Sequence, residues 1–109
     1  RGLMGKTRII KSLGRVIGNI VIHKILVEHT NKPESIPKLK NEVGTYRENA
    51  ISIATEFNWN QVEKDRIATE ALKNFTRDIK EYYPDVRYPS SEIKNLIDDT
   101  IKEVIDNFL

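Results

Sequence analysis

The sequence predicts an all-α protein, a compact bundle of about four amphipathic helices in an up-and-down arrangement or a close relative of it. Apolar residues recur every three or four positions in four segments, approximately residues 7–27, 36–57, 61–82 and 91–107. Short connections with Pro and Asn separate these segments, and no alternating strand pattern competes strongly with them. At 109 residues the chain is expected to form one domain, with residues 1–6 as a flexible basic N-terminus.

The first predicted helix is amphipathic only over its first half. At 100° per residue, its basic side chains fall opposite an apolar face formed by Ile9, Ile10, Leu13, Val16, Ile17, Ile20 and Val21. After Val21, three further apolar residues lie on other sides of the helix. Residues 20–27 are therefore expected either to be buried all round or to form a short strand, which β-branched residues favour.

The second predicted helix carries an unbroken heptad seam. Its apolar residues step by three and four along one face, at Ile36, Leu39, Val43, Tyr46, Ala50, Ile53 and Phe57. Such a seam packs either in the core of a domain or in an intermolecular coiled coil, and only three heptads in so short a chain favour the core. Gly44 lies inside this helix, where it costs about 1 kcal/mol relative to Ala.

The third and fourth helices have recognisable apolar faces. Asn60 and Glu63 predict a capping box at the start of the third helix. That helix is expected to bury Ala68, Ala71, Leu72, Phe75, Ile79 and Tyr82. The fourth helix is expected to bury Ile93, Ile97, Ile101, Val104 and Phe108. Its far side is expected to carry the acidic residues Glu92, Asp99, Glu103 and Asp106.

Charge is segregated along the chain. Residues 1–27 contain six Lys or Arg and neither Asp nor Glu, whereas residues 28–109 carry twelve basic and sixteen acidic side chains. Arg8, Lys11 and Arg15 are spaced i, i+3 and i+7, so they line one stripe of a helix, which we call the basic face. A surface of one sign attracts a partner of the opposite sign, such as phosphate groups.

The predicted contact set for phosphate or an acidic partner is Lys6, Arg8, Lys11, Ser12, Arg15 and Asn19. The simpler interpretation is that this face is only solvated, or that it pairs with the acidic side of the fourth helix in the same molecule.

Gly14 and Gly18 are four residues apart in the first helix. Small residues at this spacing allow a second helix to approach closely. We expect a close helix–helix contact here. A contact within the molecule is favoured over one across a dimer axis.

The connection at residues 82–89 is rich in aromatic residues. Tyr83, Arg87 and Tyr88 are a candidate recognition loop, because Tyr and Arg are enriched at binding hot spots. The favoured alternative is that the tyrosines cover one end of the core. Trp59 is expected to close the opposite end.

The sequence lacks the features of an enzyme. It contains no cysteine, which excludes thiol nucleophiles and Cys-ligated metals. His23 and His29 are six residues apart, not the four that a helical metal pair requires. Gly-Lys-Thr at residues 5–7 lacks the earlier glycine and the strand of a P-loop. We therefore expect no catalytic residue, no metal, no cofactor and no small-molecule substrate.

No membrane-spanning segment is expected. The longest apolar stretch, residues 20–27, is interrupted by His23 and Lys24, and a span needs about 20 apolar residues. We therefore expect a cytoplasmic protein. The abundance of Ile, Lys and Asn suggests a prokaryote or its virus as the source. Met4 is expected to be the natural start, with residues 1–3 an expression remnant.

Two functional hypotheses follow from the sequence. In the first, the chain is a small non-catalytic helical interaction module that docks a protein partner or a second copy of itself. In the second, it is an accessory nucleic-acid-binding protein that contacts phosphates through the basic face. Salt dependence separates the two, because phosphate binding weakens steeply with salt whereas hydrophobic association does not.

Overall fold

The protein is all-α, as predicted. The computed structural model describes residues 2–106, and within this part of the chain it contains four α-helices and no strand. The helices are α1 (Gly2–His29), α2 (Ile36–Ala54), α3 (Gln61–Tyr82) and α4 (Ile93–Ile101). Turns of 3₁₀-helix at Pro33–Ser35 and Ser90–Glu92 lead into α2 and α4, and one turn of π-helix, Lys102–Asp106, extends α4.

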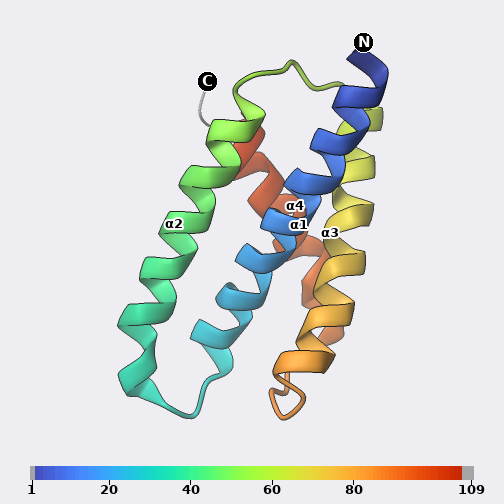
Figure 1. The fold of residues 1–109 in the computed structure, drawn as a ribbon. Helices are drawn as coiled ribbons and strands as arrows, with labels where there is room; N and C mark the ends of the chain where they lie inside the picture. Colours follow the sequence, from blue (N-terminus) through green and yellow to red (C-terminus); the bar gives the residue numbers. More distant parts are fainter. Residues whose placement is uncertain (1, 107–109) are drawn as a thin grey trace.

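α1 lies in the middle of the molecule and contacts all three other helices. In Figure 1, α2 and α3 flank α1 on either side and α4 crosses behind it. Helix directions alternate along the chain, so α1 and α3 run parallel (Figure 1). A square up-and-down bundle would place these two on a diagonal. Here they are neighbours, whereas α2 and α3 make no direct contact within residues 2–106, so the fold is a relative of that bundle.

α1 differs from the prediction at its start and over residues 20–27. The helix begins at Gly2, so residues 2–6, expected to be flexible, are helical. The strand alternative for residues 20–27 is wrong, because this segment continues α1. Ile20, Ile22 and Ile25 are all fully buried although they point in different directions. The central position of α1 explains this, since neighbouring helices cover it from several sides.

The heptad seam of α2 packs in the core of the molecule. Val43 and Ala50 are buried, and Tyr46 is half-buried against the core. α2 ends at Ala54, three residues earlier than predicted. The Ala54 carbonyl, at the end of the helix, accepts from the indole N–H of Trp59 at 3.0 Å and from the backbone N–H of Phe57 at 3.2 Å. From here the chain crosses to α3.

α3 has the predicted bounds and the predicted capping box. The Asn60 side chain accepts from the Glu63 backbone N–H, and the Glu63 carboxylate accepts from the Asn60 backbone N–H. The predicted buried stripe is partly wrong. Leu72 and Tyr82 are exposed, by 45% and 64%, whereas Ile67 and Asn74 are buried. The cause is the close approach of α1, which covers the side of α3 that carries these last two residues.

α4 buries the four described residues that the sequence predicts, Ile93, Ile97, Ile101 and Val104. Residue 107 and Phe108, also predicted as helix and core, lie outside the described residues. The expected outward acidic cluster is wrong for Glu103, which pairs with Lys24 at 3.1 Å and with Arg47 at 3.3 Å. Glu103 lies in the π-helical turn that extends α4, and this turn packs against α2, so its carboxylate reaches cations on both α1 and α2.

Among residues 2–106, no helix combines the length and the apolar character needed to cross a membrane.

Candidate functional site

The basic face of α1, formed by Arg8, Lys11 and Arg15, is exposed to solvent. The three side chains share one unbroken helix, so their spacing sets them on one side of it. None of them forms an ion pair with another described residue. Pairing with the acidic side of α4 therefore does not occur in this part of the chain, and all three side chains are exposed without a direct ion pair.

Lys6 does not belong to this surface, although the sequence placed it there. Its ammonium group donates to the carbonyl of Asn58 at 2.6 Å, pairs with Glu63 at 3.0 Å and lies 4.9 Å from the centre of the Trp59 ring. It thereby ties the connection between α2 and α3 to the N-terminal part of α1 (Figure 1). The hydrogen bond from the Asn60 backbone, followed by that from Lys6, lowers the pKa of Glu63.

Ser12 and Asn19 lie along the basic face and are half-buried. Both fall within about 40° of Arg8 when the helix is viewed down its axis, since each residue turns the chain by about 100°. The backbone carbonyl of Asn19 accepts a hydrogen bond from Nδ1 of His23 at 2.8 Å. These two polar side chains therefore extend the basic face along α1 as neutral hydrogen-bonding groups.

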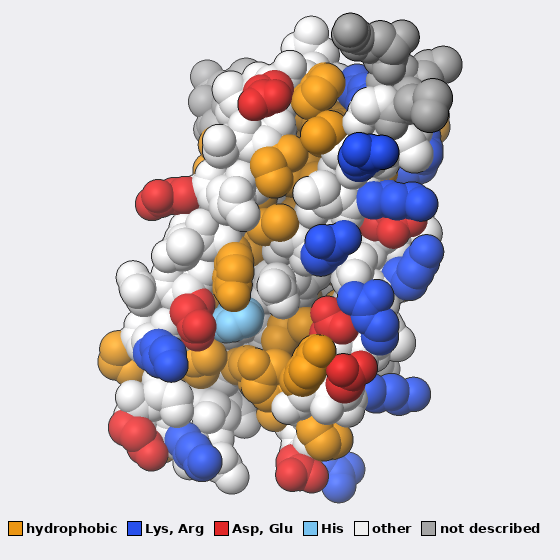
Figure 2. Space-filling view, in the orientation of Figure 1, with side chains coloured by type: hydrophobic (Ala, Val, Ile, Leu, Met, Phe, Trp, Pro, Cys, Tyr) orange, Lys and Arg blue, Asp and Glu red, His pale blue; other side chains and the backbone are white. Residues whose placement is uncertain are grey.

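α3 adds further cations beside the basic face. Its exposed basic residues are Arg66, Lys73, Arg77 and Lys80. Lys11 and Arg66 line the same hollow, of about 350 Å³, between α1 and α3. Figure 2 shows more Lys and Arg side chains on the α1–α3 side of the visible face than over α2. Asp65 and Glu70 line the same hollow, so Lys11 and Arg66 have acidic neighbours there, and the positive surface remains centred on α1.

Two of the α3 cations are already balanced by acidic neighbours. Lys73 pairs with Glu70 at 3.6 Å, and Arg77 pairs with Asp78 at 2.8 Å. The hydrogen bond to Asp78 holds the pKa of Arg77 above its usual range. α3 therefore contributes less net charge than its number of cations suggests, and α1 carries the strongest part of the surface.

Gly14 and Gly18 lie at the contact between α1 and α3, inside the molecule. A Cβ added to Gly14 would collide with the Cβ of Glu70 and come within 3.2 Å of the backbone nitrogen of Ala71. A Cβ added to Gly18 would lie 3.0 Å from the backbone oxygen of Ala71 and 3.2 Å from the Cβ of Asn74. The close helix–helix contact expected here is intramolecular, and it is occupied by α3.

The candidate recognition loop mainly covers the core. Tyr83 and Tyr88 are half-buried and pack against the core cluster. The Tyr88 ring meets the buried Phe75 ring edge-on, with 5.5 Å between ring centres. Arg87 is exposed. Of the three residues proposed for this loop, only Arg87 is exposed.

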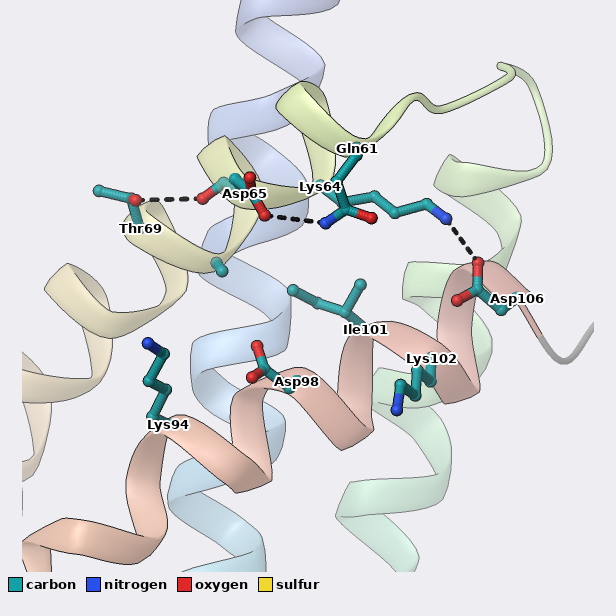
Figure 3. A pocket seen from close by; sticks show the side chains of 10 residues that line it. Gln61, Lys64, Asp65, Thr69, Lys94, Asp98, Ile101, Lys102 and Asp106 are labelled. Atoms are coloured by element: carbon teal, nitrogen blue, oxygen red, sulfur yellow. Dashed lines mark hydrogen bonds and ion pairs between the residues drawn. The ribbon is translucent and has the colours of Figure 1, made fainter.

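A larger hollow of about 640 Å³ lies between α3 and α4 (Figure 3). Its lining carries equal numbers of Lys and Asp, and Lys64 pairs with Asp106 at 2.9 Å. Lys94, Asp98 and Lys102 are four residues apart along α4, so they lie on one side of it. Because the opposite charges alternate, this hollow is not complementary to a strongly charged partner. The one hydroxyl group that lines it, Oγ1 of Thr69, donates to the backbone carbonyl of Asp65 at 3.1 Å (Figure 3).

The two histidines occupy separate surroundings. His23 is buried, with Nε2 3.6 Å from a Glu42 oxygen and its ring 5.2 Å from the ring of Tyr46. His29 lies near Glu28 and Glu92, and one ligand atom from each residue falls within 4.8 Å of the others. The sequence could not predict this second group, because Glu92 precedes α4 and is far away along the chain. Both carboxylates are exposed, and such groups are common without a metal, so we assign no ion here.

Comparison of the chain with protein-family models, with curated proteins and with solved structures gave no match.

Proposed function

We propose that this protein is a small non-catalytic interaction module and that its partner is the phosphate backbone of a nucleic acid. The observation that carries the proposal is the exposed and unpaired basic face of α1, Arg8, Lys11 and Arg15. A helix rises about 1.5 Å per residue, so this face is about 10 Å long. Phosphates follow one another at about 3.4 Å along the axis of one strand, so the face can reach about three of them.

Other surfaces that could have served binding are used inside the molecule. The glycines of α1 pack against α3, and the heptad seam of α2 packs in the core. Tyr88 covers the buried Phe75. These observations favour an electrostatic contact over a docking surface built from those elements. Contacts of this kind position a protein on nucleic acid without reading bases, so we expect little sequence preference.

Charge reversal at one residue tests this proposal. Arg15→Glu should lower affinity for a labelled duplex by about tenfold or more, because it replaces an attraction with a repulsion at the phosphate surface. Lys38→Glu is the matched control, since Lys38 is exposed on α2, away from the basic face. Both variants should keep the helical circular dichroism of the parent. Equal losses in the two variants would show only a net-charge effect, and unchanged binding by Arg15→Glu would refute the proposal.

A protein partner or a second copy of the chain is the alternative occupant. Its specific support is the exposure of two apolar side chains on α3, Val62 at 68% and Leu72 at 45%. Single exposed apolar residues are common on monomers, so this support is weaker than that for phosphate binding. Light scattering decides between them. A mass above one chain that Leu72→Lys reduces to the monomer would favour self-association.

A further inference from the structure

Gly44 has no structural explanation within the molecule. It lies in the middle of α2, where glycine costs about 1 kcal/mol relative to alanine. Its φ is not positive, and a Cβ added there would meet no atom within 4 Å among the described residues. Gly14 and Gly18, in contrast, allow the close approach of α3. A glycine that the fold does not need keeps the space beside α2 open.

That space is a groove of about 410 Å³ between α1, α2 and the start of α4. Val27, Val43 and Leu96 form its apolar walls, and Gly44 opens it towards the α2 backbone. The volume and the mainly apolar lining are those of small-ligand sites, which run from about 300 to 1,000 Å³. We call it the Gly44 groove.

Charge around the Gly44 groove is unbalanced. Lys24, Lys40 and Arg47 line it together with one acid, Glu28. Lys24 and Arg47 share a single carboxylate, Glu103, at 3.1 and 3.3 Å. Three cations against two carboxylates leave one positive charge, which one monoanion would balance.

Arg47 also has an unmet hydrogen bond. Its Nε is buried and has no acceptor among the described residues, which costs free energy in a folded protein. The Arg47 side chain as a whole is 40% exposed, so it has room to turn. A carboxylate bound beside it would accept from two of its N–H groups at once, the arrangement that Arg and carboxylate prefer.

We propose that the Gly44 groove binds a small amphiphilic carboxylate, with its hydrocarbon part between Val27, Val43 and Leu96 and its carboxylate against Arg47. Lys40, which is exposed and forms no ion pair with described residues, gives the carboxylate a second cation. The groove is distinct from the basic face, so this inference does not depend on nucleic-acid binding.

Titration with decanoate below its micelle-forming concentration tests the proposal, with decanol as the uncharged control. Amide NMR shifts should saturate and concentrate at residues 24–28, 40–47 and 96. Decanoate should bind about tenfold more tightly than decanol, since the carboxylate gains a charged partner. Arg47→Gln should remove most of that preference while leaving decanol binding unchanged.

A variant that fills the groove provides the second arm. Gly44→Leu should abolish decanoate shifts without unfolding the chain, because the new side chain enters open space between apolar walls. Gly44→Ala is its control and should still bind. Shifts scattered over other surfaces, or equal binding by Gly44→Leu, would overturn the proposal. Equal affinity for decanoate and decanol would also overturn it. So would shifts in the groove that appear only when the protein forms a dimer, because a second copy of the chain would then be the occupant.

Discussion

At the scale of single residues, three glycines in two helices have opposite physical roles. Gly14 and Gly18 sit where α1 meets α3, and each lies within 3.2 Å of neighbouring atoms once a Cβ is added. Gly44 meets nothing within 4 Å. From the sequence, all three are simply glycines inside predicted helices. The helix contacts show that packing requires Gly14 and Gly18 but does not require Gly44.

Alanine at these positions should change stability in opposite directions. Gly14→Ala and Gly18→Ala should each lower the free energy of unfolding by roughly 1–3 kcal/mol, because α1 and α3 must move apart. Gly44→Ala should raise it by about 0.5–1 kcal/mol through helix propensity. Urea denaturation followed by circular dichroism measures all three. Changes of the same sign at Gly14 and Gly44 would contradict the packing described for α1 and α3.

Glu63 should make stability depend on pH. Its pKa is lowered in the folded protein, first by the Asn60 backbone hydrogen bond and then by Lys6. The stabilisation is therefore present above the pKa of the unfolded chain and is lost as pH falls through the lower folded-state pKa. Glu63→Gln keeps a cap for Asn60 but removes the charge, so it should be less stable than the parent at neutral pH.

That difference should shrink towards zero as pH falls through the lowered pKa of Glu63, because the parent carboxylate then becomes protonated. Urea denaturation of both proteins across this range measures it. Glu48→Gln serves as the control, because Glu48 is exposed on α2 and forms no ion pair with described residues. A gap between parent and Glu63→Gln that stays constant with pH would show that the carboxylate charge does not contribute.

At the scale of helices, periodicity predicted the elements better than their contacts. The bounds of α3 follow from its capping box, Asn60 and Glu63, and from apolar spacing, both of which are local. The neighbour of each helix is not local. Periodicity does not show that α2 and α3 flank α1. It placed Leu72 and Tyr82 in the core and Lys6 on an exposed surface, and all three assignments were wrong.

The contact between α1, α2 and α4 depends on Glu103. This carboxylate accepts from Lys24 on α1 and from Arg47 on α2, and it is only one-third exposed. Glu103→Gln should lower the free energy of unfolding by about 1–2 kcal/mol, since it leaves two partly covered cations without a counter-charge. Asp99→Asn, on the exposed side of α4, should change it by less than about 0.5 kcal/mol. Thermal or urea unfolding that ranks the two variants equally would contradict this role.

At the scale of the whole molecule, charge and shape point to one exposed surface. The molecule extends 46 Å along its longest axis, and the basic face occupies about 10 Å of the N-terminal half of α1, with Arg66 of α3 beside it. The sequence alone predicted the basic face, because residues 1–27 lack acidic side chains. It could not show that Arg8, Lys11 and Arg15 would stay clear of the acids of α4, since ion pairs form between segments distant along the chain.

The salt dependence of binding to a labelled duplex tests the central claim most directly. Each phosphate neutralised contributes about −0.9 to the slope of log affinity against log salt, so three contacts predict a slope near −3. Arg8→Gln should reduce the slope by about one. A slope of this size that falls by one in the variant would support phosphate binding through the basic face. Binding that is absent, or a slope that Arg8→Gln leaves unchanged, would contradict it.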